Sequence, residues 1–302
     1  MNSEPIQFSI VIPTYNRPER LQNCLQAITN LDYPLDRFEV IVVDDGSPTP
    51  MEPIAAPFQE ALNLTVIRQI NSGPANARNA GAAKAKGQYL AFTDDDCTPL
   101  PDWLTQLEAK FATTPDCLIG GQTLNALPQN LYSTASQILI DYLYDYFNGD
   151  CNQSSFFASN NFAMPTHRFQ ELGGFDTSFP LAAGEDREFC DRWLHHGYAM
   201  IYAPEVRIKH AHHLSLQSFW RQHFNYGRGA FCFHQVRSQR NQTGIKVEPL
   251  TFYSRLLLYP FGRSTSQSAL LLSSLLFLSQ VANVLGFFKE RSHQPDKQLN
   301  WV

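Results

Sequence analysis

Three consecutive aspartates, Asp94, Asp95 and Asp96, follow the apolar run 89–92. Carboxylates crowded this closely repel one another and raise each other's pKa unless a positive charge neutralises them. Mg²⁺ or Mn²⁺ relieves such repulsion by binding one or two carboxylates, and it shares its remaining positions with substrate phosphates. The triplet therefore predicts a divalent-cation site that holds a diphosphate. The alternative is a solvated acidic turn that caps the helix after Pro101.

Two further clusters have side chains suited to a nucleotide. Asp44 and Asp45 begin the turn DDGS after an apolar run, and a carboxylate there can accept hydrogen bonds from a base N–H or a ribose hydroxyl. An ordinary Asp-Gly turn is the alternative. Arg78 lies in the segment 71–81, where a Gly/Pro turn opens a helix of small residues, and helix N-termini favour anions. Arg78 can bond a nucleobase or a phosphate, or it can pair with one of the aspartates.

The segment GEDREFCDRW (184–193) places two acids, Glu185 and Asp186, at the start of an amphipathic helix. An ordinary helix start also favours acids, through the macrodipole. A group-transfer enzyme, however, needs a carboxylate that takes the proton of the attacking hydroxyl, and the clusters above lack one. Asp186 is therefore the candidate general base, with Glu185 beside it in the candidate catalytic site.

The histidine cluster His210-Ala211-His212-His213 follows a strand-like run. A neutral imidazole is a common metal ligand, so His210 could complete the coordination of the cation at the aspartates. A single histidine of this kind is more often structural, and the acidic site is what favours the metal role.

These residues must be positioned by an alternating pattern of strands and helices. Apolar β-rich runs alternate with helical patterns: strands at 8–12, 38–43, 64–67 and 88–93, and helices at 18–28 and 75–85. Such alternation predicts right-handed crossovers and an α/β fold with a mostly parallel sheet flanked by helices. Ligands bind beyond the carboxyl ends of the strands in such sheets. The cluster Pro13-Thr14-Tyr15-Asn16, the DDGS turn and the aspartate triplet all lie at those ends.

After residue 100 the pattern is less regular, and we expect this half to hold the acceptor. It predicts helices at 101–112, 185–195 and 216–234, strand-like runs at 155–164, 199–202 and 206–210, and an aromatic segment at 132–147. Aromatic residues such as Tyr144, Phe157 and Trp220 could stack on an acceptor, although core packing is the commoner role of an aromatic side chain.

The composition argues against several classes of protein. The net charge of −5 argues against a nucleic-acid-binding protein, which needs clustered Lys and Arg. The six cysteines include no C-x-x-C pair and indicate reduced, mostly buried thiols. The N-terminus lacks a basic region followed by an apolar run, so we expect no signal peptide and a catalytic centre that faces the cytoplasm. A Rossmann dehydrogenase would need G-x-G-x-x-G after the first strand, which is absent.

The stretch 268–288 is apolar apart from Gln280 and Asn283, and it is about as long as a bilayer-crossing helix, roughly 20 residues. Basic residues flank it on both sides and do not fix an orientation. We expect either a helix embedded in or lying on a membrane, or a buried helix that packs on the catalytic domain. Membrane contact through this stretch would place the protein at the inner face of the cell membrane.

An ordered set of motifs in this chain resembles the family 2 glycosyltransferases, which have the GT-A fold. The resemblance runs from about Phe8 to Gly229 through VIPTYNRP, VVDDGS, GPANARNAG, FTDDDC, NNFAMP, GGFD, GEDREFCDRW and IKHAHHLSLQSFWRQHFNYGRG. No single motif decides it, but the ordered set is highly specific. The Q-x-x-R-W signature of processive synthases in this family is absent, which favours single-sugar addition.

The resemblance implies a role for each cluster. It implies that Asp94 lies near the ribose and Asp96 on the metal with Asp95 between them. The candidates for the metal are thus Asp94, Asp96 and His210. Asp186 is implied as the base. The candidates for binding the nucleotide sugar are Pro13, Thr14, Asn16, Asp44, Asp45, Arg78, Asp94 and Asp95, of which Thr14 and Asp45 would hold the nucleoside.

Residues and resemblance together predict a metal-dependent, inverting transferase for a nucleotide-diphosphate sugar. We expect a UDP-sugar as donor, a saccharide or lipid-linked acceptor, and a pathway of glycan, cell-envelope or glycolipid synthesis. The expected organisation is a catalytic domain at 1–235, with a nucleotide-sugar half at about 1–100 and an acceptor half at about 101–235, followed by a helical extension at 236–302. A nucleotidyltransferase or a silent nucleotide-sugar-binding protein is the alternative.

Overall fold

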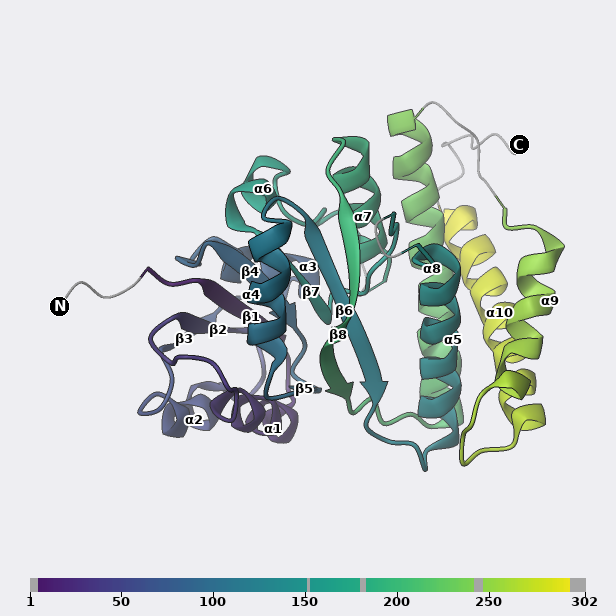
Figure 1. Ribbon diagram of the computed structural model, residues 1–302. Coiled ribbons are helices and arrows are strands. Elements are labelled where there is room, and N and C mark those ends of the chain that lie inside the picture. The colour runs from purple at the N-terminus through teal and green to yellow at the C-terminus, as the bar shows by residue number, and fades with distance from the viewer. Residues whose placement is uncertain (1–4, 151–152, 180–182, 242–246, 294–302) are drawn as a thin grey trace.

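The computed structural model describes residues 5–150, 153–179, 183–241 and 247–293 (Figure 1). The strands are β1 (Phe8–Thr14), β2 (Phe38–Asp44), β3 (Leu64–Arg68), β4 (Tyr89–Thr93), β5 (Cys97–Pro99), β6 (Leu118–Asn125), β7 (Asn161–Pro165) and β8 (Met200–His210). The α-helices are α1 (Pro18–Thr29), α2 (Glu52–Ala55), α3 (Pro74–Ala82), α4 (Trp103–Thr113), α5 (Leu131–Phe147), α6 (Thr166–Glu171), α7 (Glu185–His195), α8 (Leu216–Asn241), α9 (Leu250–Leu258) and α10 (Ala269–His293). Two 3₁₀ turns are η1 (Ala56–Phe58) and η2 (Tyr259–Gly262).

One eight-stranded sheet runs in the order β3-β2-β1-β4-β7-β6-β8-β5. The strands from β3 to β4 pair in parallel, as the alternation of strands and helices predicted. β7 is antiparallel to both β4 and β6, while β6 and β8 pair in parallel and β5 is antiparallel to β8. The predicted α/β fold flanked by helices is confirmed, and its sheet is mixed.

Helices cover both faces of the sheet. Because successive side chains of a strand point to opposite sides, residues of one strand enter both cores. In β1, Ile10 and Ile12 belong to the core that α1 and α4 cover, whereas Val11 belongs to the core on the side of α3, α6 and α7. This explains the nearly continuous apolar run in β1, which a strand buried on one face alone would not need.

The second half of the sheet differs from the pattern expected. The strand-like run 155–164 is a strand only from Asn161 onward, and the runs 199–202 and 206–210 belong to one strand, β8. Neither β5 nor β6 was predicted. A Cβ on Gly121 of β6 would lie 2.1 Å from the carbonyl oxygen of Val206, so glycine permits the close approach of β8 at this point, where the register shifts. Glycine has low strand propensity, so the sequence pattern of this segment does not predict β6.

The helices α5, α8, α9 and α10 form a layer beside the sheet (Figure 1). α10 packs closely along α8: a Cβ on Gly227 would lie 1.8 Å from the carbonyl oxygen of Asn283, and one on Gly286 would lie 1.9 Å from that of Phe224. The predicted boundary at 235/236 falls within α8, which continues to Asn241. The division into a catalytic domain and an extension therefore stays a prediction.

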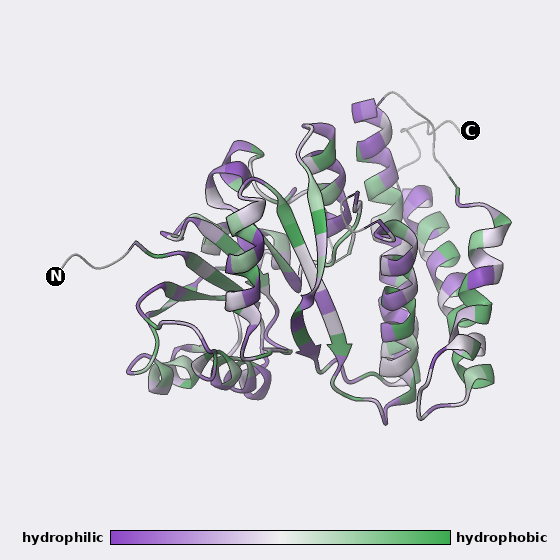
Figure 2. Ribbon diagram, viewed as in Figure 1, coloured by the Kyte–Doolittle hydropathy of each residue, from purple (hydrophilic) through white to green (hydrophobic). Residues whose placement is uncertain are grey.

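α10 is long and apolar enough to cross a membrane, with a mean hydropathy of 1.8 over its most apolar window, of which 28% is buried against the protein. Its buried side faces the other helices, and large apolar residues occupy its outer side. Figure 2 shows hydrophobic residues on α9 and α10 as well as in the strands.

Candidate active site

A cavity of about 760 Å³ lies beyond the carboxyl ends of β1 and β4, between the sheet and the helical layer. It collects most of the residues predicted from the sequence. The predicted residues that line it are Pro13, Thr14, Asp45, Arg78, Asp94, Asp95, Asp96, Glu185, Asp186 and His210. Residues that lie far apart in the sequence thus share one concave site, which is the usual form of a small-molecule site.

Asp44 and Asn16 do not line this cavity. The Asp44 carboxylate is fully buried, and it accepts hydrogen bonds from the backbone N–H groups of Ser47 at 2.9 Å and Met51 at 3.2 Å. Asn16 is exposed in the left-handed region with φ of 54°, and its backbone N–H donates to Ser47 Oγ at 2.8 Å. In this structure both residues shape the loops behind the site.

Asp45 ties the loop before α3 to the end of β2. Its Oδ1 accepts from Gln69 Nε2 at 2.7 Å and from the Ser72 N–H at 2.9 Å, and its Oδ2 accepts from the Gly73 N–H at 2.9 Å. The carboxylate therefore fixes the turn that precedes α3, and Asp45 also lines the cavity. Its expected contact with a nucleoside stays a prediction.

Arg78 joins two of the acidic clusters. Its Nη2 donates to Asp94 Oδ1 at 2.7 Å and its Nη1 to Glu185 Oε1 at 3.2 Å. This is the alternative role expected for Arg78, a pair with an aspartate, extended to a second acid. Burial and the neighbouring Asp186 charge raise the pKa of Glu185 to about 7. The buried Oε2 of Glu185 has no hydrogen-bond partner among the described residues, so one lone-pair site of the cluster is unfilled.

Asp95 and Asp96 contact two arginines that the sequence did not point to. Asp95 accepts from Thr14 Oγ1 at 2.7 Å and from Arg17 Nη1 at 3.1 Å, and burial raises its pKa to about 6. Arg20 Nη1 donates to Asp96 Oδ2 at 2.8 Å. The sequence could have indicated both arginines by their position. They lie at the start of α1, directly after β1, where side chains face the same strand ends as the aspartates.

His210 reaches the acidic triplet from β8. Its Nε2 lies 3.2 Å from Asp96 Oδ1, because β5 pairs with β8 and sets Cys97 opposite His210. Burial opposes ionisation of Asp96. The hydrogen bond from His210 and the positive charge of His210 nevertheless hold the pKa of the Asp96 carboxyl below its usual range. The His212 ring lies beside the His210 ring, with the two ring centroids 5.0 Å apart. Burial lowers the pKa of His212 to about 4.

The donor atoms at this corner suit a divalent cation. Ligand atoms of Asp96, Cys97 and His210 lie within 4.8 Å of one another. Carboxylate oxygen suits Mg²⁺ and Mn²⁺, and a neutral imidazole is a common further metal ligand. Burial raises the pKa of the Cys97 thiol well above its usual value, so the thiol stays protonated and is a poor ligand. Asp94 is not part of this group and pairs with Arg78, so its assignment as a metal ligand stays a prediction.

Asp186 lies near the start of α7, beside α8. A Cβ on the preceding Gly184, which has φ of 91°, would meet the carbonyl oxygen of Gly229 at 3.0 Å, so α7 begins in close contact with α8. The Asp186 Oδ1 accepts from the backbone N–H of Arg187 at 2.7 Å. Burial raises the pKa of Asp186, which favours proton uptake by its carboxylate.

The far wall of the cavity comes from the helical layer. Lining side chains there belong to α5, α8, α9 and α10, and most are apolar or aromatic. Tyr144 and Phe157 are buried in the core, and neither they nor Trp220 line the cavity. The aromatic side chains that line it, including Phe147, Phe252 and Phe287, had not been singled out by sequence.

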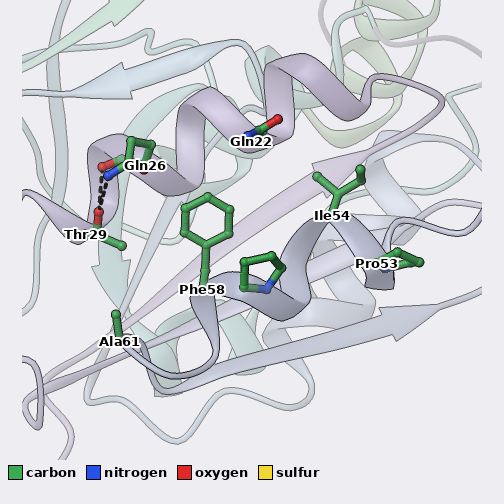
Figure 3. A pocket seen from close by; sticks show the side chains of 8 residues that line it. Gln22, Gln26, Thr29, Pro53, Ile54, Phe58 and Ala61 are labelled. Carbon is green, nitrogen blue, oxygen red and sulfur yellow. Dashed lines mark hydrogen bonds between the residues drawn. The ribbon is translucent and has the colours of Figure 1, made fainter.

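A second hollow lies between α1 and the segment formed by α2 and η1 (Figure 3). Gln22 and Gln26 from α1 line one side, and Ile54 and Phe58 line the other. The described residues that line it include no acid, histidine, cysteine, lysine or arginine. The hollow therefore lacks the groups that proton transfer or metal binding requires.

Comparison with known proteins agrees with this geometry. A family model described as "Glycosyl transferase family 2" matches residues 9–173, and one described as "N-terminal domain of galactosyltransferase" matches 142–215. Glycosyltransferase AglE of Haloferax volcanii is 32% identical over 206 residues, which cover 66% of this chain and 64% of that protein. Hyaluronan synthase of Pasteurella multocida is 28% identical over 227 residues, which cover 64% of this chain and 23% of that protein. The chain thus spans less than two thirds of the length of these relatives.

Solved structures share the fold. Mannosyltransferase PcManGT from Pyrobaculum calidifontis, in complex with GDP-Man and Mn²⁺, superposes with a TM-score of 0.62 at 20% identity, over 93% of this chain and 78% of that one. S. aureus TarS 1–349 in complex with UDP-GlcNAc superposes with a TM-score of 0.52 at 18% identity, over 98% of this chain and 97% of that one. The predicted GT-A arrangement is confirmed by these neighbours. Because the family model matches the strands and loops that carry the acidic triplet, this chain belongs to glycosyl transferase family 2.

Proposed function

We propose that this protein transfers a sugar from a nucleoside-diphosphate-sugar donor to an acceptor hydroxyl, with inversion at the anomeric carbon and with a divalent cation. The observation that carries this proposal is one cavity that holds the acidic triplet and His210 together with Asp186. Membership of glycosyl transferase family 2 supports the reaction class.

The proton-transfer step is assigned to Asp186. Its carboxylate takes the proton of the acceptor hydroxyl while that oxygen forms a bond to the anomeric carbon. The bond from this carbon to the diphosphate oxygen breaks, and its electron pair leaves with the nucleoside diphosphate. Attack from the face opposite the leaving group inverts the configuration, so an α-linked donor gives a β-linked product. Burial raises the pKa of Asp186, so its carboxylate holds a proton more strongly than an ordinary aspartate does.

Binding of the leaving diphosphate is assigned to the residues at and around the acidic triplet. Asp96 and His210 would hold a Mg²⁺ or Mn²⁺ ion, with Asp94 as the further predicted ligand, and a bound ion would supply positive charge to the diphosphate oxygens. Arg78 would add its own positive charge to the same oxygens, and the Glu185 carboxylate keeps that guanidinium in place. Thr14 and Asp45 would contact the nucleoside, because both line the same end of the cavity.

UDP-sugars are the first donors to test, with GDP-sugars next. S. aureus TarS has been solved with UDP-GlcNAc and PcManGT with GDP-Man, but both are under 25% identical to this chain and support the fold alone. For the acceptor we propose a saccharide or a lipid-linked molecule, in a pathway of glycan or cell-envelope synthesis.

We also propose that α9 and α10 contact the inner face of the cell membrane. Large apolar side chains are exposed on both helices and the turn between them: Leu250, Leu258, Phe261, Leu270, Leu271, Phe277, Val284, Leu285 and Phe288. Several large exposed apolar side chains on neighbouring helices are typical of an interaction site. Arg255 on α9 and Lys289 on α10 are exposed on the same two helices and would face anionic headgroups.

The reaction is tested by incubating the protein with a panel of UDP-, GDP-, ADP- and dTDP-sugars, with saccharide or lipid extracts as acceptors. We expect nucleoside diphosphate to be released from one class of donor with MnCl₂ or MgCl₂ and not with EDTA. Proton NMR of the product then gives its anomeric configuration. Release of pyrophosphate in place of nucleoside diphosphate, or no release from any donor, would refute the proposed transfer.

A further inference from the structure

We propose that Arg187 binds a phosphate of the acceptor, and that the acceptor is a lipid phosphate whose hydrocarbon lies against α5, α9 and α10. This inference rests on the proposed function, since it identifies the acceptor of the same site. It is carried by one cationic side chain and by the apolar wall next to it.

Arg187 directly follows the proposed base and lines the cavity. Its guanidinium makes no hydrogen bond or ion pair with any residue in the described ranges. It lies instead against aromatic rings, with Cζ 4.4 Å from the centroid of Phe233 and 6.0 Å from that of Phe147. The other arginines that line the cavity, Arg17 and Arg78, are paired with carboxylates. Among the described arginines that line the cavity, Arg187 is thus the one without a carboxylate partner.

The surroundings of Arg187 do not neutralise it. Burial and the nearby charge of Arg237 lower its pKa, because both disfavour the charged form. Glu248, Asp186 and Asp191 act in the opposite direction, but none of them bonds the Arg187 guanidinium. Asp191 pairs with Arg240 at 2.9 Å, Glu248 accepts from the Tyr146 hydroxyl at 2.9 Å, and Asp186 accepts from the backbone N–H of Arg187 at 2.7 Å. A partly buried charge without a partner is costly, and an anionic ligand offsets that cost.

An apolar wall lies beside this cation. Six of the side chains that form it are Ile140, Leu143, Phe147, Phe252, Phe287 and Phe288. Val284 and Phe288 line the cavity and are also about half exposed, so the apolar region reaches the outer surface at α10. His234 on the same side is neutral at pH 7, since burial lowers its pKa to about 4.

A lipid phosphate matches both features at once. In an acceptor whose phosphate joins the lipid to a hydroxylated head group, the phosphate would pair with Arg187, the hydrocarbon would cover the apolar wall, and a hydroxyl of the head group would lie beside Asp186. A free sugar phosphate would leave the wall in contact with water. A neutral glycolipid would leave Arg187 without a partner.

The test measures binding of decyl phosphate, below its micelle concentration, by isothermal titration calorimetry without donor. Methyl phosphate and decanol are the comparison probes. We expect Arg187→Gln to weaken decyl phosphate binding about 10- to 100-fold, the range of a charge-assisted hydrogen bond, and Arg187→Lys to keep most of the affinity. Arg221→Gln is the matched control, because Arg221 is exposed on α8 and does not line the cavity.

Removal of the hydrocarbon chain from the probe should also weaken binding. We expect methyl phosphate to bind at least ~10-fold less tightly than decyl phosphate, because a buried methylene group contributes on the order of 0.8 kcal/mol. Equal affinity of wild type and Arg187→Gln for decyl phosphate would overturn the inference, as would binding of decanol as tight as that of decyl phosphate. Absence of decyl phosphate binding would overturn it too. Because these measurements need no turnover, they separate this inference from the proposed transfer, which donor consumption tests independently.

Discussion

His210 Nε2 lies 3.2 Å from Asp96 Oδ1, although one residue ends β8 and the other precedes β5. The antiparallel pair of β5 with β8 creates this contact, in which Cys97 is opposite His210. A carboxylate and an imidazole so close together, with a thiol that burial keeps protonated, form the part of the cavity best suited to a divalent cation.

The first prediction concerns this pair. Asp96→Ala should abolish the Mn²⁺-dependent part of nucleotide binding, and His210→Ala should reduce it by about 10- to 100-fold, because each removes a proposed ligand or its partner. Titration calorimetry with UDP or GDP, with MnCl₂ and with EDTA, measures the difference. Asp116→Ala, which changes an exposed acid outside the cavity, is the control. Unchanged metal dependence in Asp96→Ala would remove Asp96 from the metal site.

The second prediction concerns the base. Asp186→Asn should lower the transfer rate by about 10²- to 10⁴-fold, because an amide cannot accept the hydroxyl proton, while donor affinity stays within a few-fold of wild type. Steady-state kinetics and donor titration measure the two effects. Asp191→Asn is the matched control, since Asp191 lies on the same helix outside the cavity. An active Asp186→Asn enzyme would show that another group takes the proton.

The third prediction concerns the contact between α8 and α10. Gly227→Ala and Gly286→Ala should each lower the free energy of unfolding by about 1–3 kcal/mol, because the added methyl meets backbone of the facing helix. Urea denaturation measures the change. Gly262→Ala has open space around the added methyl and should be close to neutral. If all three variants are equally stable, the two helices are not packed this closely in solution.

The fourth prediction uses Asp141 on α5, which lies outside the cavity. Burial raises the pKa of its carboxyl to about 6, compared with about 3.9 for an unfolded chain. Between these values the folded state binds the proton more tightly, so this group's contribution is present at low pH and is lost as the pH rises through 6. Asp141→Asn should therefore be more stable than wild type at pH 8, by about 1–2 kcal/mol, and close to it at pH 4.

Urea denaturation at both pH values tests the Asp141 prediction. Asp116→Asn, a substitution of an exposed acid, should show no comparable gain at pH 8. A gain for Asp141→Asn that is the same at pH 4 and pH 8 would exclude titration of Asp141 as its cause.

The fifth prediction concerns the outer side of α10. The double variant Leu271→Glu with Phe277→Glu should lose binding to vesicles that contain anionic lipid, because it places charge in exposed apolar surface. Vesicle flotation measures the bound fraction. Ile70→Glu is the control, since Ile70 is a highly exposed apolar residue between β3 and α3, away from the helical layer. Wild-type flotation of the double variant would argue against membrane contact through α10.

The sequence by itself determined the first four strands and the polar clusters that end them. Each of these strands is an apolar run bounded by polar residues, and such local periodicity is visible without a structure. The acidic triplet and the two acids of α7 were visible for the same reason, since a cluster of like charges is a local feature. The structure then placed both groups on one cavity.

Tertiary structure alone decided which side chains meet across that cavity. Asp44 and Asp45 are neighbours of the same type, yet the turn buries Asp44 against backbone N–H groups while Asp45 reaches the cavity. Arg17 and Arg20 were missed because their partners lie on another strand end. β6 and the apolar wall of α9 and α10 were missed because glycine close contacts and helix packing depend on residues distant in sequence. Local patterns specify elements, whereas contacts between distant segments select the residues that form the site.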